Sequence, residues 1–133
     1  MSTIQKQAAL KTLANGASIA PTGNAKFRVG NCIVHVRLCS RSARSPEKYK
    51  FNINHNTLSA EYELWICGSA QTYYLMPMSF LREIYDSPST YEDRHHPGIK
   101  VVSVDTGMHS VQYARGGVSA SLKPYHRARL HAS

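Results

Sequence analysis

Alternating apolar and polar residues between positions 26 and 39 predict a β-hairpin. Two strand-like runs, 26–29 and 32–38, are joined by Gly30-Asn31, a dipeptide typical of tight turns. In the second run every other residue from 34 to 38 is apolar, and the opposite face carries His35 and Arg37. The hairpin therefore has one face suited to a core and one that offers polar chemistry.

The rest of the chain divides into helical and strand-like segments. An apolar stripe predicts a helix that is capped by Ser2 or Thr3 and ends at about Asn15, and residues 17–24 are expected to form a loop. Residues 62–67 are almost continuously apolar, which is typical of a central strand buried on both faces. Further strands are predicted at 49–53, 72–76, 99–104, 110–114 and 118–122, with a short helix at 79–85 and a polar excursion at 86–98.

This pattern predicts a single α+β domain over residues 1–133, with a mixed central β-sheet, flanking helices and a flexible basic tail at 123–133. No apolar run approaches the length of about 18 residues that a membrane-spanning helix needs. Residues 1–13 lack the apolar core of a signal peptide. The three cysteines have no C-x-x-C spacing, so we expect reduced, structural thiols and a soluble cytoplasmic protein.

The whole chain has a net charge of +8, and the excess of positive charge lies in its first half. Residues 1–60 contain nine Lys and Arg residues against Glu47 alone, whereas residues 61–133 contain seven basic and seven acidic residues. Because such an asymmetry creates a directed field, it favours a polyanionic partner. The alternative is a solvated basic face without a partner.

The order of elements between residues 32 and 77 resembles a known family. A hairpin, a basic loop and a Tyr-x-Phe strand precede Ala-Glu-Tyr-Glu-Leu-Trp-Ile-Cys at 60–67 and Tyr-Tyr-Leu-Met-Pro at 73–77. This order is similar to the core of PD-(D/E)XK nucleases of the restriction and homing endonuclease type, over about half of the chain. The resemblance implies a restriction-endonuclease-like core.

The residues at the family's catalytic positions differ from its pattern. His35-Val36-Arg37 stands where the family has Gln/Glu-x-Lys, and Asn24 stands nearest to the place of the metal-binding Asp. Such nucleases hold Mg²⁺ with carboxylates, whereas Arg stays protonated and repels a cation. Asn24, His35 and Arg37 are therefore the catalytic candidates that the resemblance leaves, and binding without a metal or cofactor fits them better than hydrolysis.

Other chemistries have less support. His95-His96 beside Glu92 or Asp93 lacks the spacing of a metal site and is expected on a loop surface, and His55-Asn56 only faintly resembles an HNH nuclease. Nucleophile-elbow, phosphate-loop and RNP motifs do not occur in the sequence. The aromatic residues that could stack on bases are expected mainly in the core: Tyr49, Tyr62, Trp65, Tyr73 and Tyr74.

We therefore predict a nucleic-acid-binding domain, with DNA as the first partner and RNA as the second, that resembles a catalytically degenerate nuclease and forms a homodimer or larger homo-oligomer. The residues expected to contact nucleic acid are Arg37, Arg41, Arg44, Lys48, Lys50, Lys123, Arg127 and Arg129. One alternative is an active Mg²⁺-dependent endonuclease whose carboxylates are Glu61, Glu63 or those of a partner chain. The other is an interaction module that binds an acidic protein.

Overall fold

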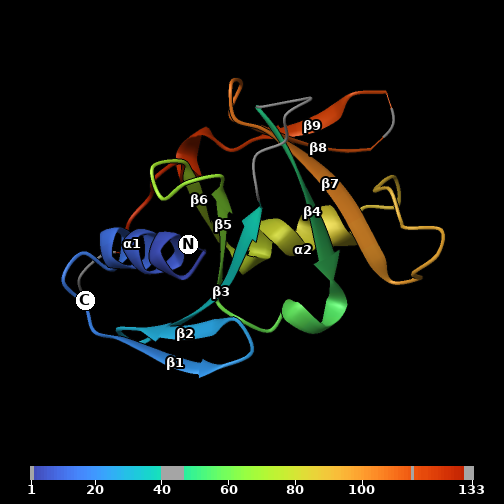
Figure 1. The fold of residues 1–133 in the computed structure, drawn as a ribbon. Helices are drawn as coiled ribbons and strands as arrows, with labels where there is room; N and C mark the ends of the chain where they lie inside the picture. The colour runs from blue at the N-terminus through green and yellow to red at the C-terminus, as the bar shows by residue number, and fades with distance from the viewer. Residues whose placement is uncertain (1, 40–46, 115, 131–133) are drawn as a thin grey trace.

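The computed structural model describes residues 2–39, 47–114 and 116–130, which form two β-sheets and two α-helices (Figure 1). Sheet A is mixed and has the order β1-β2-β3-β5-β6, while sheet B is antiparallel and has the order β4-β7-β8-β9. The strands of sheet A are β1 (Ile19–Gly23), β2 (Lys26–Val29), β3 (Cys32–Cys39), β5 (Tyr62–Cys67) and β6 (Tyr73–Pro77). The strands of sheet B are β4 (Lys48–Asn54), β7 (Ile99–Asp105), β8 (Ser110–Ala114) and β9 (Val118–Ser121).

Helix α1 (Ser2–Ala14) confirms the predicted N-terminal helix, whose suggested cap at Ser2 or Thr3 falls outside the described side chains. The helix ends where Asn15 and Gly16 adopt left-handed backbone conformations, with φ of 52° and 94°. Helix α2 (Met78–Asp86) follows β6, and two short 3₁₀ turns, η1 (His55–Thr57) and η2 (Lys123–Tyr125), complete the elements. Neither α1 nor α2, the only α-helices of the described residues, has the length and apolar character needed to cross a bilayer.

The predicted single central sheet is wrong, because β4 and β7–β9 form a second sheet. Strands β3 and β5 are parallel neighbours, so the chain must cross over between them, and this crossover runs through β4 and η1. Periodicity identified β4 as a strand but carried no information about which strand would pair with it. The coarser prediction of an α+β fold with a mixed sheet is confirmed.

The predicted loop at 17–24 is also wrong, because residues 19–23 form β1 at the edge of sheet A. Gly30 N donates to Ser18 O, and hydrogen-bonded positions alternate along an antiparallel pair. Ser18 and Ala20 therefore face β2 with their backbone groups, and the nitrogen of Pro21 faces the open edge. A proline is tolerated there because it removes no bond from the sheet.

Two apolar clusters hold the layers together. One lies between α1 and the near face of sheet A, and the other lies between sheet A, sheet B and α2. Strand β5 contributes to both, since Leu64 and Ile66 pack toward α1 whereas Trp65 and Cys67 pack toward sheet B. This confirms the prediction that residues 62–67 are buried on both faces.

The segment after β9 lies against the body of the protein as far as Leu130, although we expected a flexible tail from residue 123. Arg127 N donates to Tyr73 O at 2.9 Å, and Leu130 N donates to Leu13 O at 2.8 Å. Leu122 and Leu130 are both buried. These bonds tie residues 122–130 to β6 and α1, while residues 131–133 lie outside the described part of the chain.

Candidate nucleic-acid interface

Sheet B has one face turned toward the core and one turned toward solvent. In β4, Tyr49, Phe51 and Ile53 are buried, while the alternating residues on the other side are exposed. The strand register carries this alternation into β7, β8 and β9. We define the outer face as the residues on the solvent side of these strands: Lys48, Lys50, Asn52, Val101, Ser103, Asp105, Ser110, Gln112, Ser119 and Ser121.

Cross-strand neighbours arrange the outer face in rows. Lys50 lies opposite Ser103, which lies opposite Gln112, and Gln112 lies opposite Ser119. The neighbouring row is Lys48, Asp105, Ser110 and Ser121. Each row thus begins with a lysine on the edge strand and continues with hydrogen-bonding side chains.

Asp105 is the only acidic residue of the outer face, and it has partners within its own loop. Its Oδ1 accepts hydrogen bonds from Gly107 N at 2.9 Å and from Met108 N at 3.1 Å. Among the described residues, neither Lys48 nor Lys50 takes part in an ion pair. The outer face therefore offers two ammonium groups whose charge no carboxylate within 4.0 Å neutralises in the described part of the chain.

Tyr91 adds an aromatic ring to this surface from outside the regular strands. Its backbone lies between β7 and β8, since Tyr91 N donates to Tyr113 O at 2.9 Å and Val101 N donates to Tyr91 O at 3.0 Å. The preceding residue, Thr90, is buried and its hydroxyl donates to Ile84 O. Because successive side chains of an extended segment alternate, Tyr91 lies on the outer side, where it is 43% exposed.

Two hollows lie side by side on the outer face. One of about 320 Å³ is lined by Tyr91, Lys50, Val101, Ser103, Gln112 and Tyr113, among others. The other, of about 170 Å³, is lined by polar groups that include Lys48, Asp105 and Ser110. Ser103 and Gln112 border both hollows, so an aromatic and a polar subsite are adjacent.

The basic residues predicted to bind nucleic acid do not form one surface. Lys48 and Lys50 lie on the outer face, and Lys123 is exposed just after β9. Arg127 and Arg129 lie in the segment beside β6, where Arg127 donates to Gln71 Oε1 at 3.0 Å. The remaining two loop candidates, Arg41 and Arg44, lie outside the described residues.

Arg37 and His35 have partners inside the protein. Arg37 donates from Nη1 to the backbone oxygen of Asn52 at 3.1 Å, which joins β3 to β4. His35 is only 4% exposed, and its Nδ1 lies 2.5 Å from Glu63 Oε1 on the neighbouring strand. The expectation that the His35 side of β3 faces a ligand is therefore wrong for His35, because sheet B covers this face of the hairpin.

Glu63 joins this buried group to the aromatic core. Its second oxygen accepts a hydrogen bond from Trp65 Nε1 at 3.1 Å, and the Trp65 ring stacks on Phe51 with centroids 4.5 Å apart.

Glu61 Oε1 accepts from Ile33 N at 3.1 Å at the start of β5. Asn24, the third catalytic candidate, lies exposed in the turn between β1 and β2.

Neither of the two histidine motifs weighed from the sequence, His95-His96 and His55-Asn56, forms a metal site in the described residues. His95 and His96 lie exposed in the loop before β7, as predicted, where His95 N donates to Asp93 Oδ1 at 2.9 Å and lowers the pKa of that carboxyl. His55 lies in η1, with its ring 5.9 Å from that of Tyr85. The described residues contain no group of three or more His, Cys, Asp or Glu side chains placed to hold a metal ion.

A cluster of titratable rings lies where η2 meets β6. The imidazole centroids of His109 and His126 are 4.2 Å apart, and Tyr74 Oη lies 2.8 Å from His109 Nδ1. Burial lowers the pKa of His126, and the neighbouring His109 and Arg127 lower it further. Burial also raises the pKa of Tyr74. Both effects favour the neutral forms of His126 and Tyr74.

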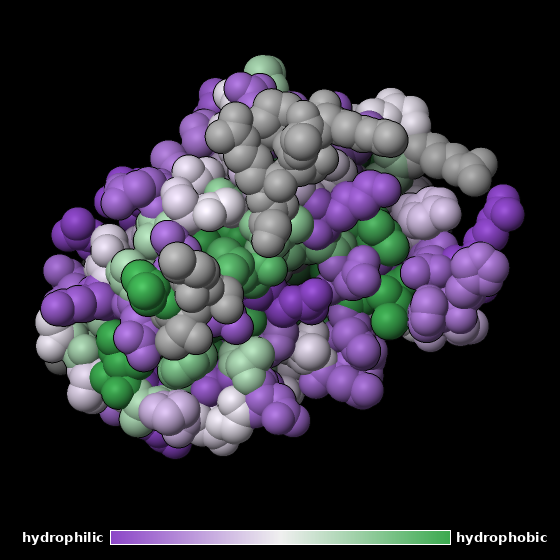
Figure 2. Space-filling model, in the orientation of Figure 1, coloured by the Kyte–Doolittle hydropathy of each residue, from purple (hydrophilic) through white to green (hydrophobic). Residues whose placement is uncertain are grey.

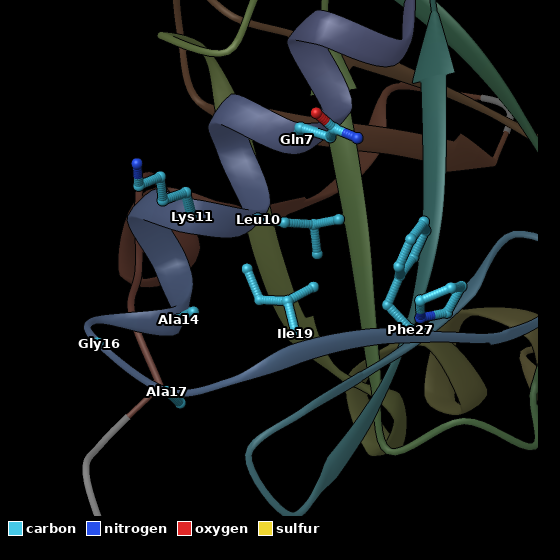
Figure 3. A pocket seen from close by; sticks show the side chains of 9 residues that line it. Gln7, Leu10, Lys11, Ala14, Gly16, Ala17, Ile19 and Phe27 are labelled. Carbon is cyan, nitrogen blue, oxygen red and sulfur yellow. The ribbon is translucent and has the colours of Figure 1, made fainter.

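A further hollow, of about 700 Å³, lies between α1 and β1 on the other side of sheet A. Figure 3 shows the Leu10, Ile19 and Phe27 side chains directed into this space, while Lys11 extends away from it. Hydrophobic surface is visible in the same region between α1 and the β1–β2 hairpin in Figure 2. This apolar lining does not suit a phosphate backbone, in contrast to the outer face.

Tyr91 was not among the residues expected to contact bases. Of those that were weighed, Tyr49, Trp65, Tyr73 and Tyr74 are buried and Tyr62 is half-buried. Tyr91 lies in the polar excursion at 86–98, which carries no strand periodicity. An isolated aromatic residue in a polar segment was the only signal available for it.

Comparisons of the chain with protein-family models, with curated proteins and with solved structures give no match.

Proposed function

We propose that this chain binds nucleic acid, with DNA as the expected polymer, through the outer face of sheet B. The observation that carries the proposal is the pair of rows in which Lys48 and Lys50 lead into Ser103, Gln112 and other polar side chains. Lysine ammonium groups bind phosphates, while hydroxyl and amide groups bind phosphate, sugar or base edges.

Charge along the chain supports the same surface. Arg41 and Arg44 precede β4 by a few residues in the sequence, so the strand that carries both lysines follows a stretch of chain with two further basic residues. One row of the outer face marks one end of sheet B and consists of Lys48, Asp105, Ser110 and Ser121. Lys123 comes two residues after Ser121, so it lies at the same end of the sheet as Lys48. Positive charge from Lys48 and Lys123 at this end of the sheet steers a polyanion toward it.

Binding is favoured over cutting by the surroundings of the residues at the nuclease-like positions. His35 Nδ1 contacts Glu63, and Nη1 of Arg37 donates to the backbone oxygen of Asn52. Glu63, the carboxylate closest to this point, is 2% exposed. A nuclease needs carboxylates that are open to Mg²⁺ and to a phosphate. We therefore propose a catalytically degenerate relative of the PD-(D/E)XK nucleases that binds nucleic acid without cutting it.

The proposal is tested by fluorescence anisotropy with labelled DNA between about 50 and about 200 mM salt, with and without Mg²⁺. Removing two phosphate contacts with Lys48→Ala and Lys50→Ala should lower the slope of log K against log salt by about 2. The affinity at the lowest salt should fall about tenfold.

A matched control removes the same charge from α1 with Lys6→Ala and Lys11→Ala. This variant should keep the wild-type slope, because α1 lies on the other side of sheet A from sheet B. Equal losses in both double variants would mean that net charge, rather than the outer face, governs binding. A probe cut in Mg²⁺ would favour the nuclease alternative, and no binding at low salt would favour an acidic protein partner.

A further inference from the structure

We infer that the outer face of sheet B selects single-stranded nucleic acid and that a base stacks on Tyr91. This inference rests on the proposed function and adds the form of polymer and the residue that reads it. Tyr91 is the only Phe, Tyr or Trp among the described residues whose side chain is exposed. Because this exposed ring lies on a polar sheet face that carries lysines, we expect a ligand that includes a planar apolar group.

Hydrogen bonds and bridges fix the backbone around Tyr91 on that face. Residues 90–92 form isolated bridges with the flanking strands, Thr90 with Ala114 and Glu92 with Lys100. The Glu92–Lys100 pair adds an ion pair of 3.3 Å, and Thr90 is anchored to the end of α2 through Ile84 O. Because this segment is already ordered, its backbone loses little conformational freedom when a base covers the exposed ring.

The hollow beside Tyr91 contains the other groups that a nucleotide needs. Lys50 borders it and can bind the phosphate, while the Gln112 amide can both donate to and accept from a base edge. Val101 and Tyr113 supply apolar surface between them. The adjoining hollow at Lys48 repeats the cation and the hydroxyl groups without the aromatic ring, and Asp105 also lines it. Because Asp105 Oδ1 accepts hydrogen bonds from Gly107 N and Met108 N, we assign the phosphate in this hollow to Lys48 and the sugar to the hydroxyl groups.

A base within a double helix cannot stack on Tyr91. Base faces in a double helix are covered by their neighbours, so a tyrosine on a sheet face can reach them only in a single strand or after a base has left the stack. Stacking on aromatic side chains combined with a basic path for the backbone is the usual means of binding single strands. Lys48 and Lys50, two residues apart on one side of β4, lie along such a path.

The experiment compares anisotropy titrations of three labelled probes: a mixed-sequence DNA single strand of about 12 nucleotides, its blunt duplex, and an abasic strand of equal length. The wild type should bind the single strand at least about tenfold more tightly than the duplex or the abasic strand. Tyr91→Ala should weaken single-strand binding about 5- to 100-fold and leave duplex binding unchanged.

Two control variants isolate the role of the ring. Tyr91→Phe should bind the single strand within about threefold of wild type, because stacking needs the ring and not the hydroxyl. Ile4→Ala removes a 64% exposed apolar side chain from α1 and should leave all three affinities unchanged. Fluorescence of Trp65, the single tryptophan, verifies that each variant is folded.

The outcomes separate this inference from the function on which it rests. Equal affinity for all three probes, with binding that depends on Lys48 and Lys50 but not on Tyr91, would overturn the inference and leave the proposed function standing. Binding to none of the probes at low salt would overturn both. A single-strand preference that disappears in Tyr91→Ala supports both.

Discussion

Replacing His35 with alanine removes the hydrogen-bond partner of a buried carboxyl group and tests whether this residue belongs to the core or to a binding surface. His35 Nδ1 and Glu63 Oε1 are 2.5 Å apart, and both side chains are almost fully buried. Glu63 also accepts a bond from Trp65 Nε1. The variant therefore leaves one carboxyl oxygen without its donor in a place that water does not reach.

The expected cost follows from two contributions. A buried polar atom that loses its partner costs about 1–3 kcal/mol, and more when the atom is charged. The space left by the imidazole adds a cavity, for which large-to-small core changes cost about 2–5 kcal/mol. Because the surroundings relax in part, we expect His35→Ala to lower the free energy of unfolding by roughly 3–5 kcal/mol.

The assay is urea unfolding followed by Trp65 fluorescence, since this ring contacts Glu63 and stacks on Phe51. With a slope of about 1–3 kcal/mol per molar urea, the midpoint should fall by at least about 1 M. In a double-mutant cycle, His35→Ala and Glu63→Ala should show a coupling energy of about 1.5–3 kcal/mol. His35→Gln, which keeps a donor, should recover part of the loss.

Additive effects in the cycle, within about 0.5 kcal/mol, would refute the argument that the pair is one buried unit. The DNA affinity of the folded His35→Ala protein should stay within about twofold of wild type, because the side chain lies between the sheets. A loss of tenfold or more would place His35 at the ligand and contradict the assignment of the interface to sheet B.

Three further predictions concern backbone strain, pH and thiol reactivity. Gly68→Ala should destabilise the protein by more than Gly116→Ala, which should cost about 1 kcal/mol in urea unfolding. Both glycines have φ near +80°, but a Cβ at Gly68 would lie 2.8 Å from Tyr49 Oη, and equal costs would contradict this. Because the pKa of His126 is lower in the folded protein than in the unfolded chain, the unfolded chain binds a proton at this imidazole at a higher pH than the folded protein does. The free energy of unfolding should therefore fall as the pH drops below about 6.5. His126→Gln should reduce that fall, measured as the urea midpoint at two pH values, and an unchanged pH dependence would be inconsistent with the assignment. Because burial raises the pKa of Cys67, this thiol should be the slowest of the three to react with iodoacetamide, and early labelling of it by mass spectrometry would argue against the packing.

Local pattern was sufficient for most of the elements. The hairpin at 26–39 followed from its alternation and from Gly30-Asn31, and both are as predicted, with Gly30 in a left-handed conformation at φ 60°. The buried strand at 62–67 followed from its continuous apolar run. β1 was missed because Pro21 and Gly23 are typical of loops, and only the free edge of sheet A makes this strand tolerable.

The amino-acid sequence by itself determined the class of the fold, the strand periodicity and the charge asymmetry, because these depend on residues close together in the chain. It did not determine that β4 would leave the sheet of β3 and β5, since strand pairing depends on contacts between distant segments. That pairing buries His35 beside Glu63 and exposes Lys48 and Lys50 on the outer face. It also brings Tyr91 from a polar loop to the same face, so the tertiary structure alone decided which residues share the proposed site.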